Sequence, residues 1–488
     1  MLVYKLRKYI AEKNIPKIKY FLQQGADPNF VGGRINPPIF AAVRTLDIKI
    51  VKAMVEGGAD VNLLNNKGEN LIHTLYSDTN HHTLDSKREI FKYLIEKGLV
   101  LSNHANTVHS PLFNILNNDD NEIFNSIIDS GFDIKSATFN NYTLLMHISK
   151  KSYPRCVHEK LLDDVDYINQ QDSTGKTAIM HNSYNYGFQF AELLLKKGAS
   201  VTITDFENMS AYEYISRNDY YRTIQDMHLI LKDRGENIPQ EILDKALIKT
   251  YEYDNLKNFQ SILEMGANPN AICPKTKMHI VEKIIIGKRY IERSQHKFLE
   301  LLEGNKVNFN IIDEKGNNLI HRMFEKYNDI DAKMLDRLIK NNIDINLPNS
   351  LGKTPMHILV KKHNERAVNY VIGEYHVNPN LKDKKGISLM HESILHGNYE
   401  NVKVLWSKKA DIDAQTTEGI SCLILSCMKN RVKITDFLIR KGAKIFAQDK
   451  NGLTAFDYAA KEDGTEYGNI IDLLYNKLEK RQNPKQLQ

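Results

Sequence analysis

The chain has 488 residues, of which 42% are hydrophobic, a composition that favours a folded protein over a disordered one. Its 66 basic and 60 acidic residues give a formal net charge of +6, and the lysines alternate with acidic residues instead of gathering in one block. Because binding to nucleic acid phosphates needs a concentrated basic face, we do not expect nucleic acid as a partner.

No segment is apolar enough to indicate a membrane span. The densest apolar run, residues 280–286, is interrupted by Glu282 and Lys283, and basic residues within the first ten positions break up any core of a secretory signal. We therefore expect a cytoplasmic protein that makes no contact with a membrane. The cysteines form no CxxC pair, which is typical of a reducing compartment; they are Cys156, Cys273, Cys422 and Cys427.

A five-residue motif recurs along the chain. It reads Gly-Ala-Asp-Pro-Asn at 25–29, Gly-Ala-Asp-Val-Asn at 58–62 and Gly-Ala-Asn-Pro-Asn at 266–270. Its first position, which we call the mark, returns every 31 to 40 residues and mostly every 33 or 34. The marks are 25, 58, 98, 131, 164, 198, 235, 266, 306, 342, 376, 409 and 442, and glycine is replaced at 164, 306, 342, 376 and 409.

Before most marks lies an apolar triplet with the spacing i, i+3, i+4. This spacing predicts a short helix with one apolar face, and glycine at the mark predicts a left-handed residue at the end of that helix. The triplets, including one after the last mark, begin at Ile18, Val51, Ile90, Phe124, Phe190, Phe259, Phe298, Leu335, Val368, Val402, Ile434 and Ile470.

A glycine-containing turn and a further helix follow in each unit. The helix opens with Ser or Thr, often with Pro next, as in Ser110-Pro111 and Thr354-Pro355, which is favourable chemistry for the start of a helix. The turns are Asn66-Lys67-Gly68, Thr174-Gly175, Lys315-Gly316, Leu351-Gly352, Lys385-Gly386 and Asn451-Gly452.

This unit resembles the ankyrin repeat, a turn followed by two antiparallel helices, with Thr354-Pro355-Met356-His357 close to the Thr-Pro-Leu-His signature. The resemblance implies an all-α ankyrin-repeat solenoid, a curved elongated rod of about 14 helix-turn-helix repeats that are stabilised by stacking on one another. We expect the array at 2–478 and a polar tail at 479–488. The expected repeats are 2–35, 36–66, 67–103, 104–136, 137–171, 172–204, 205–237, 238–271, 272–312, 313–347, 348–382, 383–415, 416–448 and 449–478.

Two units are about seven residues longer than the others, through insertions at Tyr76–His82 and Gly287–His296. In solenoids such insertions lie in loops on one face, often the binding face. Neutral variation in exposed turns explains them equally well, so both interpretations stay open.

The motifs that suggest catalysis all fall on repeat positions. Gly175-Lys176-Thr177 and Gly352-Lys353-Thr354 end like a phosphate-binding loop but lack its earlier glycine. Histidines return at the signature position, where the resemblance implies a hydrogen bond to the adjoining turn; Met146 and Met180 stand there in other repeats, which argues against a metal. We therefore expect no metal, no cofactor and no enzymatic activity. The histidines are His73, His279, His321, His357 and His391.

Aromatic residues give the candidates for partner binding. Trp406 is aligned with the apolar triplets and is expected to be buried, and Tyr212 matches a core position. Tyr214 follows the signature position, which in the family faces the concave surface. We predict a partner-binding patch in this region, with an unusually tyrosine-rich core as the alternative. The predicted partner-binding residues are Tyr184, Tyr186, Tyr214, Tyr220, Tyr221, His147, His181 and Arg322.

The resemblance implies a non-catalytic scaffold or adaptor that binds other proteins. Irregular repeats rich in Lys, Asn, Ile and Tyr, without a further domain, are similar to stand-alone arrays of large DNA viruses or intracellular bacteria. We therefore expect host proteins as partners and the host cytoplasm as the location. A structural component of a particle or multiprotein assembly is the alternative. Poxvirus members usually end in an F-box-like segment, whereas the C-terminus here shows a short tail rich in Lys and Gln, so the sequence leaves ubiquitin-ligase recruitment open.

Overall fold

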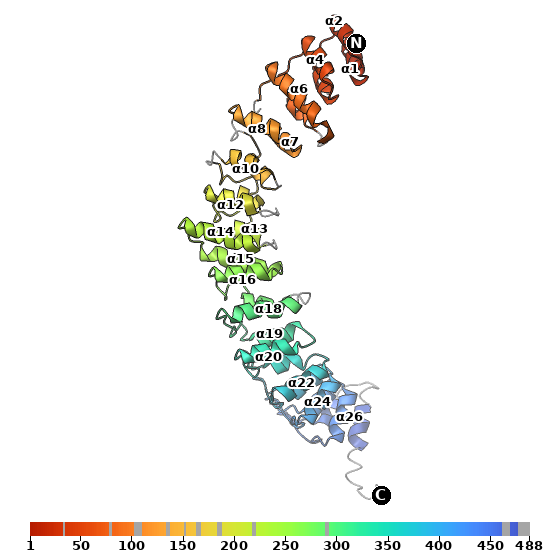
Figure 1. The fold of residues 1–488 in the computed structure, drawn as a ribbon. Helices are drawn as coiled ribbons and strands as arrows, with labels where there is room; N and C mark the ends of the chain where they lie inside the picture. The colour runs from red at the N-terminus through yellow and green to blue at the C-terminus, as the bar shows by residue number, and fades with distance from the viewer. Residues whose placement is uncertain are drawn as a thin grey trace. The chain divides into compact units, whose positions relative to one another are not determined.

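The computed structural model describes residues 1–32, 35–77, 81–101, 110–132, 137–150, 153–162, 167–182, 188–216, 221–287, 292–460 and 469–476. The chain divides into two compact units, Met1–Asn268 and Pro269–Gln488. In each unit, short helices follow one another along the chain (Figure 1). Within the described ranges, no helix has both the length and the apolar character needed to cross a membrane.

The helices come in pairs, and we call the two members of a pair the first and the second helix. In unit 1 the first helices are α1 (Leu2–Ala11), α3 (Pro38–Arg44), α5 (Leu71–Leu75), α7 (Pro111–Asn117), α9 (Leu144–Ile148), α11 (Ala178–Asn182), α13 (Ala211–Ile215) and α15 (Gln240–Glu252). Their second helices are α2 (Ile15–Gln23), α4 (Ile48–Glu56), α6 (Leu84–Glu96, after the 3-10 turn His81–Thr83), α8 (Asn121–Asp129), α10 (Arg155–Leu161), α12 (Phe188–Lys196), α14 (Tyr221–Asp233) and α16 (Leu256–Glu264).

Unit 2 continues the same order. Its first helices are α17 (Ile280–Ile285), α19 (Leu319–Lys326), α21 (Pro355–Leu359), α23 (Leu389–Leu395), α25 (Cys422–Met428) and α27 (Ala455–Ala460). Its second helices are α18 (Glu292–Glu303), α20 (Ala332–Lys340), α22 (Glu365–Glu374), α24 (Tyr399–Ser407) and α26 (Val432–Arg440), and residues 469–476 are helical after α27.

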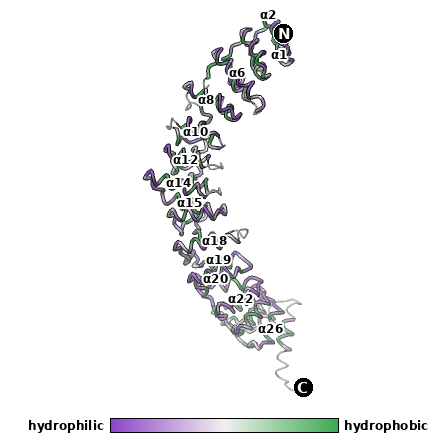
Figure 2. Tube along the Cα trace, in the orientation of Figure 1, coloured by the Kyte–Doolittle hydropathy of each residue, from purple (hydrophilic) through white to green (hydrophobic). Residues whose placement is uncertain are grey.

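Each pair is stabilised by stacking on its neighbours. First helices contact first helices, as α1 does with α3, and second helices contact second helices, as α14 does with α16 and α22 with α24. Apolar and polar residues are interspersed along the coloured parts of the trace (Figure 2), as expected where each helix buries only one face. The first residue of every predicted triplet is buried, none with more than 4% of its surface exposed, so the predicted apolar stripes are confirmed.

The marks adopt the left-handed backbone that the sequence predicts. Eight of them are glycines with φ between +71° and +100°, from Gly25 to Gly442. The four non-glycine marks that the structure describes are also left-handed; they are Lys306, Asn342, His376 and Lys409, with φ between +50° and +68°. The repeat geometry therefore imposes this conformation even on side chains that make it costly.

The asparagine that closes the recurring motif links neighbouring repeats. Asn29 donates to the Gly58 carbonyl over 2.9 Å and accepts from the Asp60 amide over 2.8 Å. Asn62 makes the same pair of bonds one repeat later, to the Gly98 carbonyl and the Val100 amide. The side chain of this asparagine thus satisfies backbone groups of the next loop.

In seven repeats of the described part of the chain, the turn before the first helix is ordered by one Asp or Asn side-chain oxygen at its start. Asp383 Oδ1 accepts from the Lys385 and Ile387 amides, both over 2.9 Å. An Asp or Asn oxygen makes equivalent bonds in other repeats, and we call these residues the turn oxygens: Asn65, Asp172, Asp205, Asp313, Asn349, Asp383 and Asp449.

Consecutive turns in unit 2 also bond to one another through their backbones. The Lys384 amide donates to the Leu351 carbonyl over 3.2 Å, and the Thr417 amide to the Lys385 carbonyl over 2.9 Å. Gly352 has φ +77°, and a Cβ there would lie 2.6 Å from the Lys384 nitrogen. Glycine is required at this turn both by its backbone angle and by the approach of the next turn.

One turn in the described ranges contains a β-hairpin. Strands β1 (Thr138–Phe139) and β2 (Tyr142–Thr143) pair antiparallel. Asn140 and Asn141 connect them with φ of +49° and +61°, the angles that a two-residue type I′ turn requires and that asparagine tolerates. The hairpin is a local addition to an otherwise helical fold.

The first insertion does not begin as an exposed loop. Tyr76 is 2% exposed, and its hydroxyl donates to Asp120 of the next repeat over 2.7 Å. Lys87 is fully buried and donates to Asn118 over 2.7 Å. The start of this insertion is therefore part of a buried polar contact between two repeats, and the interpretation as a wholly exposed loop is wrong at Tyr76.

Replacing Gly352 by alanine tests the packing between turns, with Gly442 as the matched control. Gly442 has φ +93° and no atom within 4 Å of its would-be Cβ, so Gly442→Ala carries only the left-handed penalty of about 1–2 kcal/mol. Gly352→Ala adds the clash with Lys384, and urea unfolding should show a clearly larger loss of stability. Equal losses in the two variants would contradict this account.

Candidate binding surface

The fourth residue of each first helix follows the signature position, and we call it position 4. His147, His181, Tyr214 and Arg322 occupy it in α9, α11, α13 and α19. The sequence places these four side chains on a binding surface. Their contacts in the structure decide how much of each remains available to a partner.

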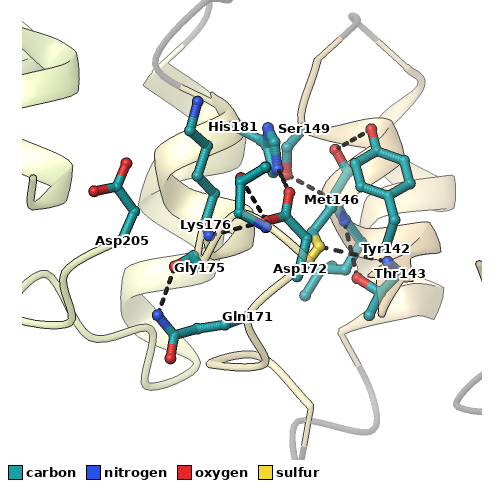
Figure 3. A network of polar contacts seen from close by, with 12 residues as sticks. Tyr142, Thr143, Met146, Ser149, Gln171, Asp172, Gly175, Lys176, His181 and Asp205 are labelled. Carbon is teal, nitrogen blue, oxygen red and sulfur yellow. Dashed lines mark hydrogen bonds and ion pairs between the residues drawn. The ribbon is translucent and has the colours of Figure 1, made fainter. Parts of the chain in front are cut away.

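His181 is bonded to the turn oxygen of its own repeat (Figure 3). Asp172 Oδ1 accepts from the Thr174 and Lys176 amides over 2.8 and 3.0 Å, and its Oδ2 accepts from His181 Nε2 over 2.8 Å. His181 is only 5% exposed. Burial lowers its pKa although Asp172 acts in the opposite direction. The imidazole therefore links the turn to the helix through a hydrogen bond, and little of the side chain is exposed to solvent.

Tyrosines make the same bond in two other repeats. The Tyr214 hydroxyl donates to Asp205 Oδ2, and the Tyr458 hydroxyl donates to Asp449 Oδ2 over 2.7 Å. In all three repeats the donor follows the acceptor by nine residues. Tyr214 is 4% exposed, so the prediction that it lies on the surface is wrong. Its hydroxyl bonds to the Asp205 carboxylate, and the ring is buried.

His147 and Arg322 are also engaged with neighbouring repeats. His147 Nε2 lies 3.0 Å from Asn117 Oδ1 and the ring meets Phe113 edge-on at 5.1 Å; the residue is half-buried. Arg322 forms an ion pair with Glu282, which is 3% exposed. Of the other predicted residues, Tyr184, Tyr186 and Tyr220 lie outside the described ranges, and Tyr221 is described only as the first residue of α14.

The signature histidines hold successive turns together. His391 Nδ1 accepts from the Ser388 amide over 3.3 Å, and its Nε2 donates to the Ile420 carbonyl of the next repeat over 3.0 Å. His321 and His357 repeat this arrangement with the Lys353 and Ile387 carbonyls. Burial lowers the pKa of all three imidazoles, which favours the neutral form that can both accept and donate. The predicted bonds to the turns are confirmed here.

The repeat that contains His279 departs from this pattern. His279 immediately precedes α17, and Glu282 stands at the signature position, so the sequence alignment is wrong at His279. Cys273 takes the place of the turn oxygen, since its amide donates to the Met278 carbonyl as the Asp205 amide does to Met209. Lys283, at position 4, approaches Cys273 Sγ to 3.6 Å.

The surroundings of Cys273 favour its thiolate. Burial acts to raise the pKa of the thiol, but hydrogen bonds from Thr276 and the Lys275 amide, together with the Lys283 charge, hold it below its usual value. Burial raises the pKa of Cys422 and Cys427. The turn that binds a carboxylate in other repeats thus stabilises an anion here as well.

Lys353, from the segment that ends like a phosphate-binding loop, serves to connect two repeats. Its ammonium lies 2.9 Å from Glu392, and Lys361 lies 3.1 Å from the same carboxylate. Burial would raise the pKa of Glu392, but the two lysines outweigh it and hold the pKa low. In the described part of the chain, no group of three or more His, Cys, Asp or Glu side chains is placed to hold a metal ion.

Trp406 was predicted to be buried, but the structure shows it exposed. Its side chain is 38% exposed, whereas Val402 and Leu405 of the same triplet are fully buried. The last triplet residue lies at the edge of the apolar stripe, where the large indole is only partly covered. Trp406 meets Phe437 edge-on at 5.9 Å and carries the Lys441 ammonium 4.0 Å from its ring centre.

Large apolar side chains are exposed within the turns or up to three residues before them, in the segments that we call the turn tips, a feature that the sequence reasoning missed. A signal was present, because these residues interrupt turns that are otherwise polar. With their exposed fractions they are Phe206 (77%), Ile272 (50%), Ile312 (57%), Leu351 (64%) and Phe446 (61%).

Removing the Tyr214 hydroxyl should destabilise the protein. Tyr214→Phe leaves Asp205 Oδ2 without its phenolic donor in a buried setting, at a cost of about 1–3 kcal/mol. Tyr458→Phe breaks the same bond at a half-exposed site and should cost less. Urea unfolding of both variants measures the difference; a Tyr214→Phe variant as stable as the parent would show that the bond contributes nothing.

Cys273 should react with a thiol reagent at lower pH than the other described cysteines. Because its pKa is lowered, its thiolate fraction, and with it the alkylation rate, rises at a pH below the value of about 8.5 for a free cysteine. Site-resolved mass spectrometry after iodoacetamide pulses measures each cysteine separately. Lys283→Met should move the Cys273 profile upward, and an unchanged profile would exclude the lysine as a cause.

Comparisons with known proteins agree with this architecture. The family model "Ankyrin repeats (3 copies)" matches residues 112–205 and 389–486. The Arabidopsis thaliana potassium channel AKT2/3 is 27% identical over 140 residues, which are 29% of this chain and 17% of the channel. A probable 26S proteasome regulatory subunit p28 of Saccharomyces cerevisiae is 30% identical over 104 residues, 20% of this chain and 45% of the subunit.

A putative ankyrin repeat protein of fowlpox virus is 26% identical over 136 residues, 28% of this chain and 22% of the viral protein. The chain thus spans less than half the length of each of these relatives. Family match, relatives and stacked helix pairs agree: the chain contains ankyrin repeats and folds as an all-α repeat solenoid.

Proposed function

We propose that this chain is a non-catalytic scaffold or adaptor that binds other proteins through its turn tips. The observation that supports the proposal is the exposure of large apolar side chains on turns whose backbone is held by their own hydrogen bonds. Phe206 is 77% exposed, yet its own turn is held by Asp205, which accepts the Glu207 and Met209 amides over 2.9 Å.

Such a turn binds at low entropic cost. Its backbone is already fixed by the turn oxygen and by bonds to the neighbouring turn, as the Phe206 amide makes to the Thr174 carbonyl over 3.2 Å. Little ordering therefore remains when a partner arrives. Exposed aromatic and aliphatic side chains can then supply the contact energy.

The groups with catalytic character already have structural partners, which supports a role without chemistry and without a cofactor. Lys353 is paired with Glu392, and the imidazoles of His357 and His391 are used between neighbouring turns. Ankyrin repeats are in general modules of protein interaction.

For the partner we propose a protein of a eukaryotic host cell, met in its cytoplasm. The similarity to a fowlpox virus ankyrin repeat protein supports this choice, as does the array's resemblance to those of large DNA viruses and intracellular bacteria.

Capture from a eukaryotic cell extract tests the function. The full chain is immobilised beside Phe206→Ser, which alters a turn tip, and Leu229→Ser, which removes a 55% exposed apolar side chain from α14. We expect the parent and Leu229→Ser to retain the same few proteins, and Phe206→Ser to retain at least one of them several-fold less. Helical circular dichroism confirms that all three are folded.

Two results would contradict the proposal. One is retention of nothing beyond what a resin without the chain retains. The other is a selective loss with Leu229→Ser while Phe206→Ser behaves as the parent, which would move the binding surface to the second helices.

A further inference from the structure

The turn tips at the start of unit 2 combine exposed apolar side chains with unpaired lysines. Ile272 and Ile312 stand directly before two successive turns, Leu351 lies within the next turn, and the three are 50%, 57% and 64% exposed. Lys315, Lys384 and Lys385 are exposed on the same or the following turn, and among the described residues no ion pair is found for them. We call these six residues the tip stripe.

The tip stripe is continuous because the turns are bonded to one another. The Asn308 amide donates to Asn270 Oδ1 over 2.7 Å, which links the loops that carry Ile272 and Ile312. The Ser350 amide donates to the Lys315 carbonyl over 2.9 Å. The Lys384 amide then donates to the Leu351 carbonyl, so four successive tips form one connected surface.

The charge on this surface is positive on balance, because six exposed lysines on these loops, Lys275, Lys277, Lys315, Lys382, Lys384 and Lys385, outnumber the three acids Asp313, Glu314 and Asp383. Its carboxylates at Asp313 and Asp383 accept backbone amides within their own turns. Glu314 is the exposed acid beside Lys315. Lys353 is neutralised by Glu392. The stripe's lysines are therefore left to attract negative charge from a partner.

We propose that the tip stripe binds an acidic, extended peptide segment of a partner protein, with a large apolar side chain at every third residue. This proposal rests on the protein-binding function above and names the chemistry of one partner. The apolar row distinguishes it from a nucleic acid site, because phosphates would use the lysines alone. Packed helices lie about 8–10 Å apart, and an extended chain rises about 3.3 Å per residue, so three residues span one repeat.

The test uses a defined probe, a fluorescein-labelled peptide Leu-Glu-Ser-Leu-Glu-Ser-Leu-Glu-Glu, in fluorescence anisotropy with the full chain. Two comparison peptides replace Glu by Lys, or Leu by Ser. We expect saturable binding of the first peptide and at least tenfold weaker binding of each of the others. No binding of the acidic apolar peptide at millimolar protein overturns the proposal.

Variants locate the binding. Lys384→Glu with Lys385→Glu should weaken the probe about tenfold or more, and Ile312→Ser severalfold. The matched control, Lys429→Glu with Lys433→Glu, makes the same charge change at exposed lysines at the end of α25 and on α26 and should leave binding within twofold. An equal loss in the control pair overturns the proposal, because it shows only a nonspecific charge effect.

A nucleic acid arm and the capture experiment separate the remaining possibilities. A single-stranded oligonucleotide of uridine is tested beside the acidic peptide. The proposal is overturned if the oligonucleotide binds more tightly than the peptide and if its binding is weakened in the Lys384 and Lys385 variant. If extract proteins are lost with Phe206→Ser and the probe does not bind, the peptide proposal fails while the scaffold function stands.

Discussion

One interaction underlies the arrangement of the turns: a side-chain oxygen at the start of the turn accepts two backbone amides. Asp172, Asp205, Asp313, Asp383 and Asp449 all make it. A turn so close to solvent would otherwise depend on water for these amides. The bond fixes the turn before the helix begins, and the next turn can then approach closely enough to form its own backbone bond.

The second oxygen of the carboxylate connects the turn to the helix. His181, Tyr214 and Tyr458 donate to it from position 4. In the repeat that carries Cys273, a thiol and Lys283 take the same two places. In each case an acidic side chain at the start of the turn faces a donor on the helix, although the chemistry of the pair differs.

Much of the fold could be predicted from the sequence because it depends on spacing. The apolar triplets give the stacking face directly, and even Lys306 and His376 adopt the backbone expected of a glycine. The boundaries of the single repeats remain a prediction. The alignment at His279 is wrong because its turn is longer than its neighbours, which no local pattern reveals.

The candidate surface was harder to predict, because a side chain at position 4 can either bond to the turn carboxylate or stay accessible to a partner. A side chain there faces a partner only if the turn carboxylate does not bind it, and Tyr214 is bound whereas the sequence shows only a tyrosine. Trp406 shows the converse, since it keeps the helical spacing of a core residue but is too large for the edge of the stripe. Exposure at Phe206 or Leu351 depends on how far each turn projects, a property of the assembled array.

The central claim is that the turn tips are preformed in the free chain. Hydrogen–deuterium exchange of the unbound protein tests it most directly, at the Glu207, Met209, Lys385 and Ile387 amides that bond to Asp205 and Asp383. We predict that these amides exchange as slowly as those of the adjoining first helices. Exchange at the rate of an unstructured peptide would contradict the account, because the tips would then have to be ordered by the partner.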